Sequence, residues 1–200
     1  MVELDNLLIY KLKNEWIAGL FSPDPGVRTG AAEQIYATGY TSAERIVRGW
    51  CENAEFARLL GEILSVTVGL AVTPETFAKI REANGWPRLA DVPAEQDAVE
   101  FELPFEGNVA LDVLTSREPD GTGAIAKFLS KLGEGVQQVE FRCSDVDRAT
   151  VILRERFGMN AVYPETRLGA DGTRVNFFLV PGSDRKKVLI ELYEAGPIRF

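Results

Sequence analysis

The pattern of apolar residues changes from helical to extended near Ser65. Before this point apolar residues recur at the three-to-four-residue spacing of a helix face, and a Pro- and Gly-rich stretch at 22–26 predicts a break. The first helical stripe is formed by Leu4, Leu8, Leu12, Trp16 and Leu20. We expect two more helices before residue 65, a short one over 31–38 that ends at Gly39 and a longer one over 41–64.

The longer helix has a clear start signal. Thr41 and Glu44 have the spacing of a capping box, in which the hydroxyl accepts one backbone N–H and the carboxylate accepts another. An apolar stripe then continues from Ile46 to Leu64. We expect this stripe to pack on the rest of the protein, with partner binding as the alternative.

Beyond Ser65 one order of elements occurs twice, as in an internal repeat. The first copy is predicted to contain a strand at 66–72, a helix at 75–84 and strands at 98–103 and 108–115, followed by a helix at 124–132. The second copy is predicted to contain a strand at 136–143, a helix at 146–157 and strands at 161–166, 174–180 and 188–193. We predict an α+β fold of two βαβββ modules, in which a curved mixed sheet holds a ligand on its concave face. The predicted domains are a helical extension over 1–64 and modules over 65–133 and 134–200.

Composition and charge narrow the function. Apolar residues make up 46% of the chain and charged residues 26%, which is ordinary for a soluble globular protein. The net charge of −8, without a block of Lys and Arg, argues against binding to nucleic acid or to an anionic membrane surface. The two cysteines are not spaced as a metal or disulfide motif, and the N-terminus does not have the pattern of a signal peptide. We therefore expect a reduced, cytoplasmic protein that acts on a small molecule.

The chain contains no histidine. A zinc or cobalt site built on imidazole is therefore impossible, and so is a catalytic Ser-His-Asp or Cys-His arrangement. Any proton transfer must use carboxylates, Lys, Tyr, Cys or water.

Several short motifs point to one family. The run 133–141 (GEGVQQVEF) resembles a G-x-G-[LIV]-H-H-[IV]-x-[FW] strand, but Gln137 and Gln138 stand where two histidines are usual. The further segments that match in order are 124–129 (AIAKFL), 145–147 (DVD), 172–177 (GTRVNF) and 188–192 (VLIEL). Together these residues resemble methylmalonyl-CoA epimerases of the vicinal-oxygen-chelate (glyoxalase/bleomycin-resistance) superfamily. The resemblance covers about residues 92–195 and implies a homodimer that binds an acyl-CoA.

The resemblance also implies where a metal site would lie. Members of the family bind a divalent metal through His, Gln or Glu, His and Glu, and the metal stabilises the enolate while two glutamates move the proton. In this chain the four metal positions are those of Thr67, Asp112, Gln138 and Glu191, and the second catalytic glutamate falls on Glu100. The resemblance therefore implies that the catalytic carboxylates Glu100 and Glu191 are kept and that both imidazole ligands are lost. No cofactor is required by the sequence, and Mg²⁺ or Ca²⁺ at an all-oxygen site is the alternative.

Alternation along the predicted strands adds to this cluster. On the strand at 136–143 one face carries Gln138, Glu140 and Arg142, whereas Cys143 falls on the opposite, packed face and is expected to be inert. Glu191 lies among apolar residues, where a charge is costly unless it is paired or functional. We predict that Asp112, Gln138, Glu140 and Arg142 bind the substrate near Glu100 and Glu191. The structural alternative is that Arg142 neutralises Glu140 and Glu191 in buried ion pairs.

Three functions are consistent with this cluster. In the first, an isomerase moves a proton α to a carbonyl or thioester with Glu100 and Glu191, and Arg142, Gln138 or a hard cation stabilises the enolate. In the second, a metal-free enzyme of another class, such as a lyase, cyclase or dehydratase, uses the same carboxylates. In the third, the protein binds or sequesters a small molecule without chemistry. Fold alone does not choose among them, and we favour the isomerase.

Overall fold

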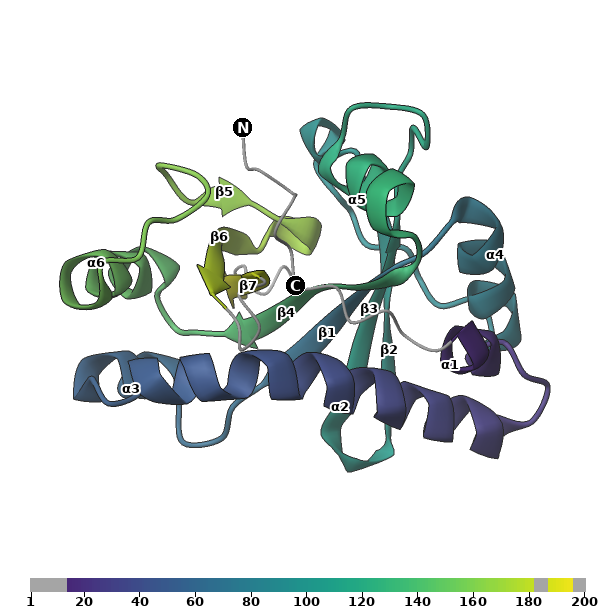
Figure 1. Cartoon of the computed structure of the whole chain (residues 1–200), viewed down its shortest axis with the longest axis horizontal. Helices are drawn as coiled ribbons and strands as arrows, with labels where there is room; N and C mark the ends of the chain where they lie inside the picture. Colours follow the sequence, from purple (N-terminus) through teal and green to yellow (C-terminus); the bar gives the residue numbers. More distant parts are fainter. Residues whose placement is uncertain (1–13, 182–186, 196–200) are drawn as a thin grey trace. The chain divides into compact units, whose positions relative to one another are not determined.

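A computed structural model describes residues 14–181 and 187–195 (Figure 1). The helices are α1 (Asn14–Gly19), α2 (Pro25–Trp50), α3 (Ala54–Leu60), α4 (Pro74–Ala83), α5 (Ala124–Leu132) and α6 (Val146–Phe157). The strands are β1 (Val66–Ala71), β2 (Val99–Phe105), β3 (Val109–Thr115), β4 (Gly135–Arg142), β5 (Arg167–Leu168), β6 (Arg174–Pro181) and β7 (Lys187–Glu194). Short 3-10 turns cover Ala94–Gln96, Glu106–Asn108 and Ala170–Gly172. The start of the first predicted helical stripe, with Leu4, Leu8 and Leu12, lies outside the described residues.

The described residues form two compact units. The first unit comprises residues 14–39 and 67–137, and the second comprises 40–66, 138–181 and 187–195. In the first unit the strand order is β2-β3-β1, with β1 parallel and β2 antiparallel to β3. In the second unit the order is β4-β7-β6-β5, with β4 parallel to β7 and the other pairs antiparallel. The predicted α+β class, with repeated strand–helix–strand modules after N-terminal helices, is confirmed.

The predicted capping box at Thr41 and Glu44 is wrong, because α2 runs unbroken through both residues (Figure 1). Glu44 accepts hydrogen bonds from the Tyr40 hydroxyl at 3.2 Å and from the Arg48 guanidinium at 2.6 Å. The Arg48 contact is the ordinary i, i+4 contact of a helix surface. The helix predicted over 41–64 is instead divided at residues 51–53 between α2 and α3.

The predicted helix end at Gly39 is also wrong, and its cause lies in packing. Gly39 sits inside α2, where glycine lowers helix stability by about 1 kcal/mol relative to alanine. A Cβ at this position would lie 2.5 Å from Cγ1 and 2.8 Å from Cγ2 of Val68 on β1. Glycine is therefore required by the close approach of α2 to β1 within the first unit, and it does not end the helix.

The core of the first unit lies between α4 and its strands. The ring of Phe77 on α4 meets that of Phe101 on β2 edge-on, with 4.7 Å between centroids. The side chain of Asn84, which follows α4, donates a hydrogen bond to the carbonyl of Leu20 at 2.9 Å and so joins α4 to the segment after α1. The contact between Phe77 and Phe101 lies on the face of the strands opposite to the one that carries Glu100 and Asp112.

The core of the second unit gathers around Trp50, the last residue of α2. Its ring makes edge contacts with Phe56 of α3 at 5.8 Å and with Phe178 of β6 at 6.2 Å. Phe56 and Phe178 are completely buried. The predicted packing of this apolar stripe on the rest of the protein is therefore confirmed for the part that ends α2 and forms α3.

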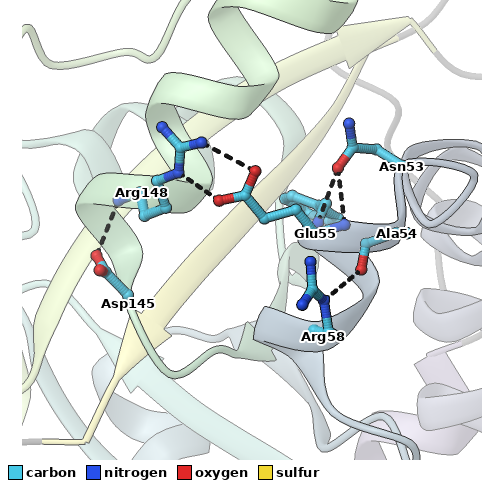
Figure 2. Close-up of polar contacts among 7 residues, drawn as sticks. Asn53, Ala54, Glu55, Arg58, Asp145 and Arg148 are labelled. Atoms are coloured by element: carbon cyan, nitrogen blue, oxygen red, sulfur yellow. Dashed lines mark hydrogen bonds and ion pairs between the residues drawn. The ribbon is translucent and has the colours of Figure 1, made fainter.

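Polar contacts join α3 to α6 on the surface of the second unit (Figure 2). Arg148 of α6 binds both carboxylate oxygens of Glu55 of α3, at 2.6 and 2.9 Å. Each helix is capped beside this pair: Asn53 accepts from the backbone N–H of Glu55, and Asp145 accepts from that of Arg148 at 2.8 Å. The two caps supply partners for N–H groups that a helix start leaves unsatisfied, and so they position the two charged residues.

The predicted strand at 161–166 is wrong. Only Ala161 pairs, through an isolated bridge to Phe178, and regular pairing resumes at β5. In this segment Tyr163 instead stacks beneath the guanidinium of Arg167. None of the helices in the described part combines the length and apolar character that crossing a bilayer requires.

Candidate functional site

Three of the predicted site residues form one hydrogen-bonded group in the second unit. Glu140 on β4 and Glu191 on β7 are direct neighbours in the parallel pairing of these strands. Gln138, two residues before Glu140 and therefore on the same face, donates from Nε2 to Oε1 of Glu140 at 3.1 Å and to Oε2 of Glu191 at 2.7 Å. One amide group thus bridges two carboxylates on adjacent strands.

The bridge explains how two acidic residues can lie side by side here. Glu191 is buried, with 9% of its surface exposed, and Glu140 is half-buried. Carboxylates in such positions are costly unless they accept hydrogen bonds, and like charges directly across two strands repel each other. The NH₂ group of Gln138 has two hydrogens and reaches both carboxylates, so it offsets both costs without changing its own protonation state.

The opposite face of the same strands is closed. Val139 and Phe141 of β4 lie in register with Ile190 and Leu192 of β7, and all four side chains are completely buried. Cys143 continues this packed face just after β4, and burial raises the pKa of its thiol to about 12. Because only a thiolate is an effective nucleophile, this cysteine is excluded as a catalytic group.

Arg142 lies on the Glu140 face but is not part of the hydrogen-bonded group. It is exposed and lies in register with Tyr193 of β7. Its backbone N–H donates a hydrogen bond to the carbonyl of Ser65 at 3.1 Å. Gln138 binds both carboxylates, and the structural alternative, in which Arg142 neutralises Glu140 and Glu191 in buried ion pairs, stays a prediction.

The remaining predicted residues lie in the first unit. Asp112 on β3 is paired with Glu102 on β2 and lies in register with Gly69 on β1. Glu100 is two residues from Glu102 and shares this face, as does Thr67, two residues before Gly69. Glu100 and Asp112 are half-buried and Thr67 is buried. The predicted convergence of Asp112 and Glu100 with the group around Glu191 stays a prediction.

Sequence reasoning missed a column of aromatic and cationic side chains beside Glu191. Phe177 of β6 is the antiparallel partner of Glu191, and its ring meets that of Tyr163 edge-on at 5.9 Å. The guanidinium carbon of Arg167 lies 3.7 Å from the centroid of the Tyr163 ring. The alternation of β6 could have placed Phe177 on this face, but no sequence signal indicates the stacking of Tyr163 and Arg167.

The residues at the four metal positions do not fit the metal that the resemblance implies. Thr67 and Gln138 replace the imidazole ligands, and Gln138 points its amide nitrogen, which cannot ligate a cation, at Glu191. No group of three or more Cys, Asp or Glu side chains in the described ranges could hold a metal ion. An all-oxygen site for Mg²⁺ or Ca²⁺ gains no support from this donor set.

Comparison with known proteins finds related solved structures. No family model and no curated protein matches the sequence. Among solved structures, the methylmalonyl-CoA epimerase of Mycobacterium tuberculosis is 32% identical with a TM-score of 0.54, and the match covers 67% of this chain and 88% of that one. A Streptomyces coelicolor methylmalonyl-CoA epimerase variant in complex with 2-nitronate-propionyl-CoA is 26% identical with a TM-score of 0.52, and the match covers 66% and 96% of the two chains.

A third structure, a methylmalonyl-CoA epimerase in complex with methylmalonyl-CoA and NH₄⁺, is 27% identical with a TM-score of 0.51, and the match covers 66% of this chain and 94% of that one. The three matches share the fold of this chain. At the identity and coverage of the mycobacterial match, the chain belongs to the methylmalonyl-CoA epimerase family of the vicinal-oxygen-chelate superfamily.

Proposed function

We propose that this protein is an isomerase that moves the proton on the carbon α to the carbonyl of an acyl-CoA thioester, with Glu100 and Glu191 as the acid–base pair. The observation that carries the proposal is the Gln138–Glu191 hydrogen bond, which holds a buried carboxylate beside Glu140 on an otherwise apolar strand. Family membership supplies the substrate class, because related enzymes bind methylmalonyl-CoA and 2-nitronate-propionyl-CoA.

The proposed reaction needs two carboxyl groups on opposite sides of one carbon. One carboxylate removes the α-proton, and the electron pair of the C–H bond moves onto the thioester oxygen as an enolate. The other carboxyl group then returns a proton to the opposite side of the carbon, which inverts its configuration. This sequence requires neither a histidine nor an oxidant, and it assigns one role each to Glu100 and Glu191.

The enolate needs a positive partner, and the structure favours Arg142 over Gln138 for this role. Both hydrogens of the Gln138 amide are directed at Glu140 and Glu191, so this amide serves to position the carboxylates. Arg142 is on the same face and is exposed. A guanidinium directed at developing negative charge is a common way to stabilise an enolate.

Exchange of the α-proton with solvent deuterium tests the proposal. The protein is incubated with (S)- or (R)-methylmalonyl-CoA in D₂O, and deuterium at the α-carbon and inversion of configuration are followed by mass spectrometry and chiral analysis. E191Q and E100Q should each lower the inversion rate by about 10²–10⁴-fold, the range expected for loss of an acid–base group. E102Q is the matched control, because Glu102 is an exposed neighbour on the strand and face of Glu100.

Each outcome distinguishes the proposal from its competitors. Full activity in both E191Q and E100Q contradicts the assigned roles, and a large loss in E102Q alone transfers the role of Glu100 to Glu102. Tight binding of acyl-CoA without exchange in the wild-type protein identifies a binding protein. Activity that disappears with a chelator and returns with added metal contradicts an acid–base site that works without an imidazole-bound metal.

A further inference from the structure

We propose that Arg167 is a specificity residue that binds a carboxylate at the free end of the acyl group, with Tyr163 and Phe177 as the support that holds it in place. This inference rests on the proposed function, because it assigns a role in binding the same acyl thioester. It concerns residues to which neither the sequence nor the family resemblance assigns a role.

Two independent observations place Arg167 on the face that carries Glu191. In the strand pairing, Arg167 of β5 is in register with Val175 of β6, and Val175 is in register with Tyr193 of β7, two residues after Glu191. Residues in register on paired strands point to the same face. The side-chain contacts agree, because they lead from Arg167 to Tyr163 and from there to Phe177, the strand partner of Glu191.

The separation suits a short acyl group. Arg167 is two strands away from β7, which corresponds to about 10 Å across the sheet, and its register position is displaced from Glu191 by about 7 Å along the strands. The long arginine side chain spans much of this distance. A substrate whose α-carbon lies at Glu191 would therefore direct a nearby charged end towards the guanidinium.

The guanidinium of Arg167 is held but keeps its hydrogen-bond donors available. Its carbon lies over the Tyr163 ring, 3.7 Å from the ring centroid, in a cation–π contact that leaves the N–H groups able to bind an anion. It donates no hydrogen bond to, and forms no ion pair with, another residue in ranges 14–181 and 187–195. A fixed guanidinium with unused donors matches the two oxygens of a carboxylate.

The position favours the acyl carboxylate over a phosphate of CoA as the bound anion. Arg167 lies on the same face as Glu191, the residue proposed to act on the α-carbon, whereas the pantetheine arm keeps the phosphates many bonds away from that carbon. The net charge of −8 repels an anionic acyl group. A positively charged side chain on the same face as the two glutamates offsets this repulsion.

Calorimetric binding with three ligands tests this inference and does not depend on turnover. Methylmalonyl-CoA carries the acyl carboxylate and the phosphates, propionyl-CoA lacks the carboxylate, and methylmalonyl-pantetheine lacks the phosphates. Arg167→Gln should weaken both methylmalonyl ligands by about tenfold or more, as expected for loss of a charge-assisted bond, and propionyl-CoA by less than about twofold. Arg167→Lys should recover part of the lost affinity, because it restores the positive charge but not the paired N–H donors of a guanidinium.

Arg154→Gln is the control, because Arg154 is exposed on α6 of the same unit and its replacement makes the same change in net charge. It should leave all three affinities unchanged. If Arg167→Gln weakens the binding of methylmalonyl-CoA and propionyl-CoA equally, the residue contacts a phosphate and the inference is overturned. The inference is also overturned if the binding of no ligand is weakened. Failure of the proposed function is visible separately, as absence of α-deuterium in every thioester with the wild-type protein.

Discussion

Replacement of Gly39 by alanine tests whether the approach of α2 to β1 is as close as the structure shows. In an exposed helix interior, Gly→Ala stabilises a protein by about 0.5–1 kcal/mol, because alanine loses less backbone entropy and favours the helix. At Gly39 the new Cβ would lie 2.5 and 2.8 Å from the two methyl groups of Val68. The usual sign of this substitution should therefore be reversed.

The size of the effect follows from the geometry. Both methyl groups of Val68 lie within 3.0 Å of the new Cβ and its own Cβ lies at 3.3 Å, so rotation about χ1 does not clear the contact. Overpacking of this kind costs about 1–3 kcal/mol, which exceeds the helix gain. Gly30 is the matched control, because it lies in the same helix and a Cβ there meets nothing within 4 Å.

Urea unfolding followed by circular dichroism measures the difference. We expect G30A to be more stable than the wild-type protein by about 0.5–1 kcal/mol and G39A to be less stable than G30A by about 1–3 kcal/mol. Val68→Ala removes the two methyl groups that make the closest contacts, so G39A in the V68A background should recover much of the stabilisation seen for G30A. The coupling between the two sites should be about 0.5–3 kcal/mol.

The reasoning is refuted if G39A is as stable as G30A, because α2 and β1 would then be further apart than described. It is also refuted if G39A is equally destabilising with and without the Val68 methyl groups. The second result would place the cost somewhere other than the contact on which the argument depends.

Two other groups give predictions about pH and reactivity. Hydrogen bonds from Thr166 and then Arg174 lower the pKa of Asp147, so its contribution to stability is present above its unfolded pKa of about 3.9 and is lost as the pH falls through its lower folded pKa. D147N should therefore flatten the dependence of the unfolding free energy on pH below about pH 4, measured by urea titration at each pH; an unchanged slope contradicts this assignment. Because burial raises the pKa of Cys143 to about 12, iodoacetamide at pH 8 should leave it unmodified in peptide maps of the native protein and label it after unfolding, and rapid native labelling would contradict its burial.

Local signals in the sequence were sufficient for some elements and not for others. Helices α5 and α6 begin and end where the sequence predicted, and glycines at their C-terminal ends, Gly133 and Gly158, have the positive φ that favours glycine. Gly39 is also a glycine, but it is needed for a different reason. It makes room for Val68, which lies on a strand distant in the sequence. A glycine that permits a turn and one that permits close packing cannot be distinguished from the sequence around them.

The candidate site shows the same limit. Period-2 alternation correctly placed Gln138, Glu140 and Arg142 on one face of their strand, because alternation is a property of a single strand. The pairing of Glu140 with Glu191, and the choice of Gln138 over Arg142 as their partner, depend on register and side-chain direction. The position of Arg167 depends on β5, a two-residue strand that is too short to give a periodic pattern in the sequence.

The two compact units are interleaved along the chain, and this has a consequence for synthesis. The first unit uses residues before position 40 and again from 67 to 137, so all its segments have been made once residue 137 leaves the ribosome. Residues 40–66 belong to the second unit, and Trp50 must wait for Phe178, its packing partner, until nearly the whole chain has been translated. During that interval an apolar helix surface is without its strands, so nascent chains arrested between these points should depend on chaperones more than the finished protein does.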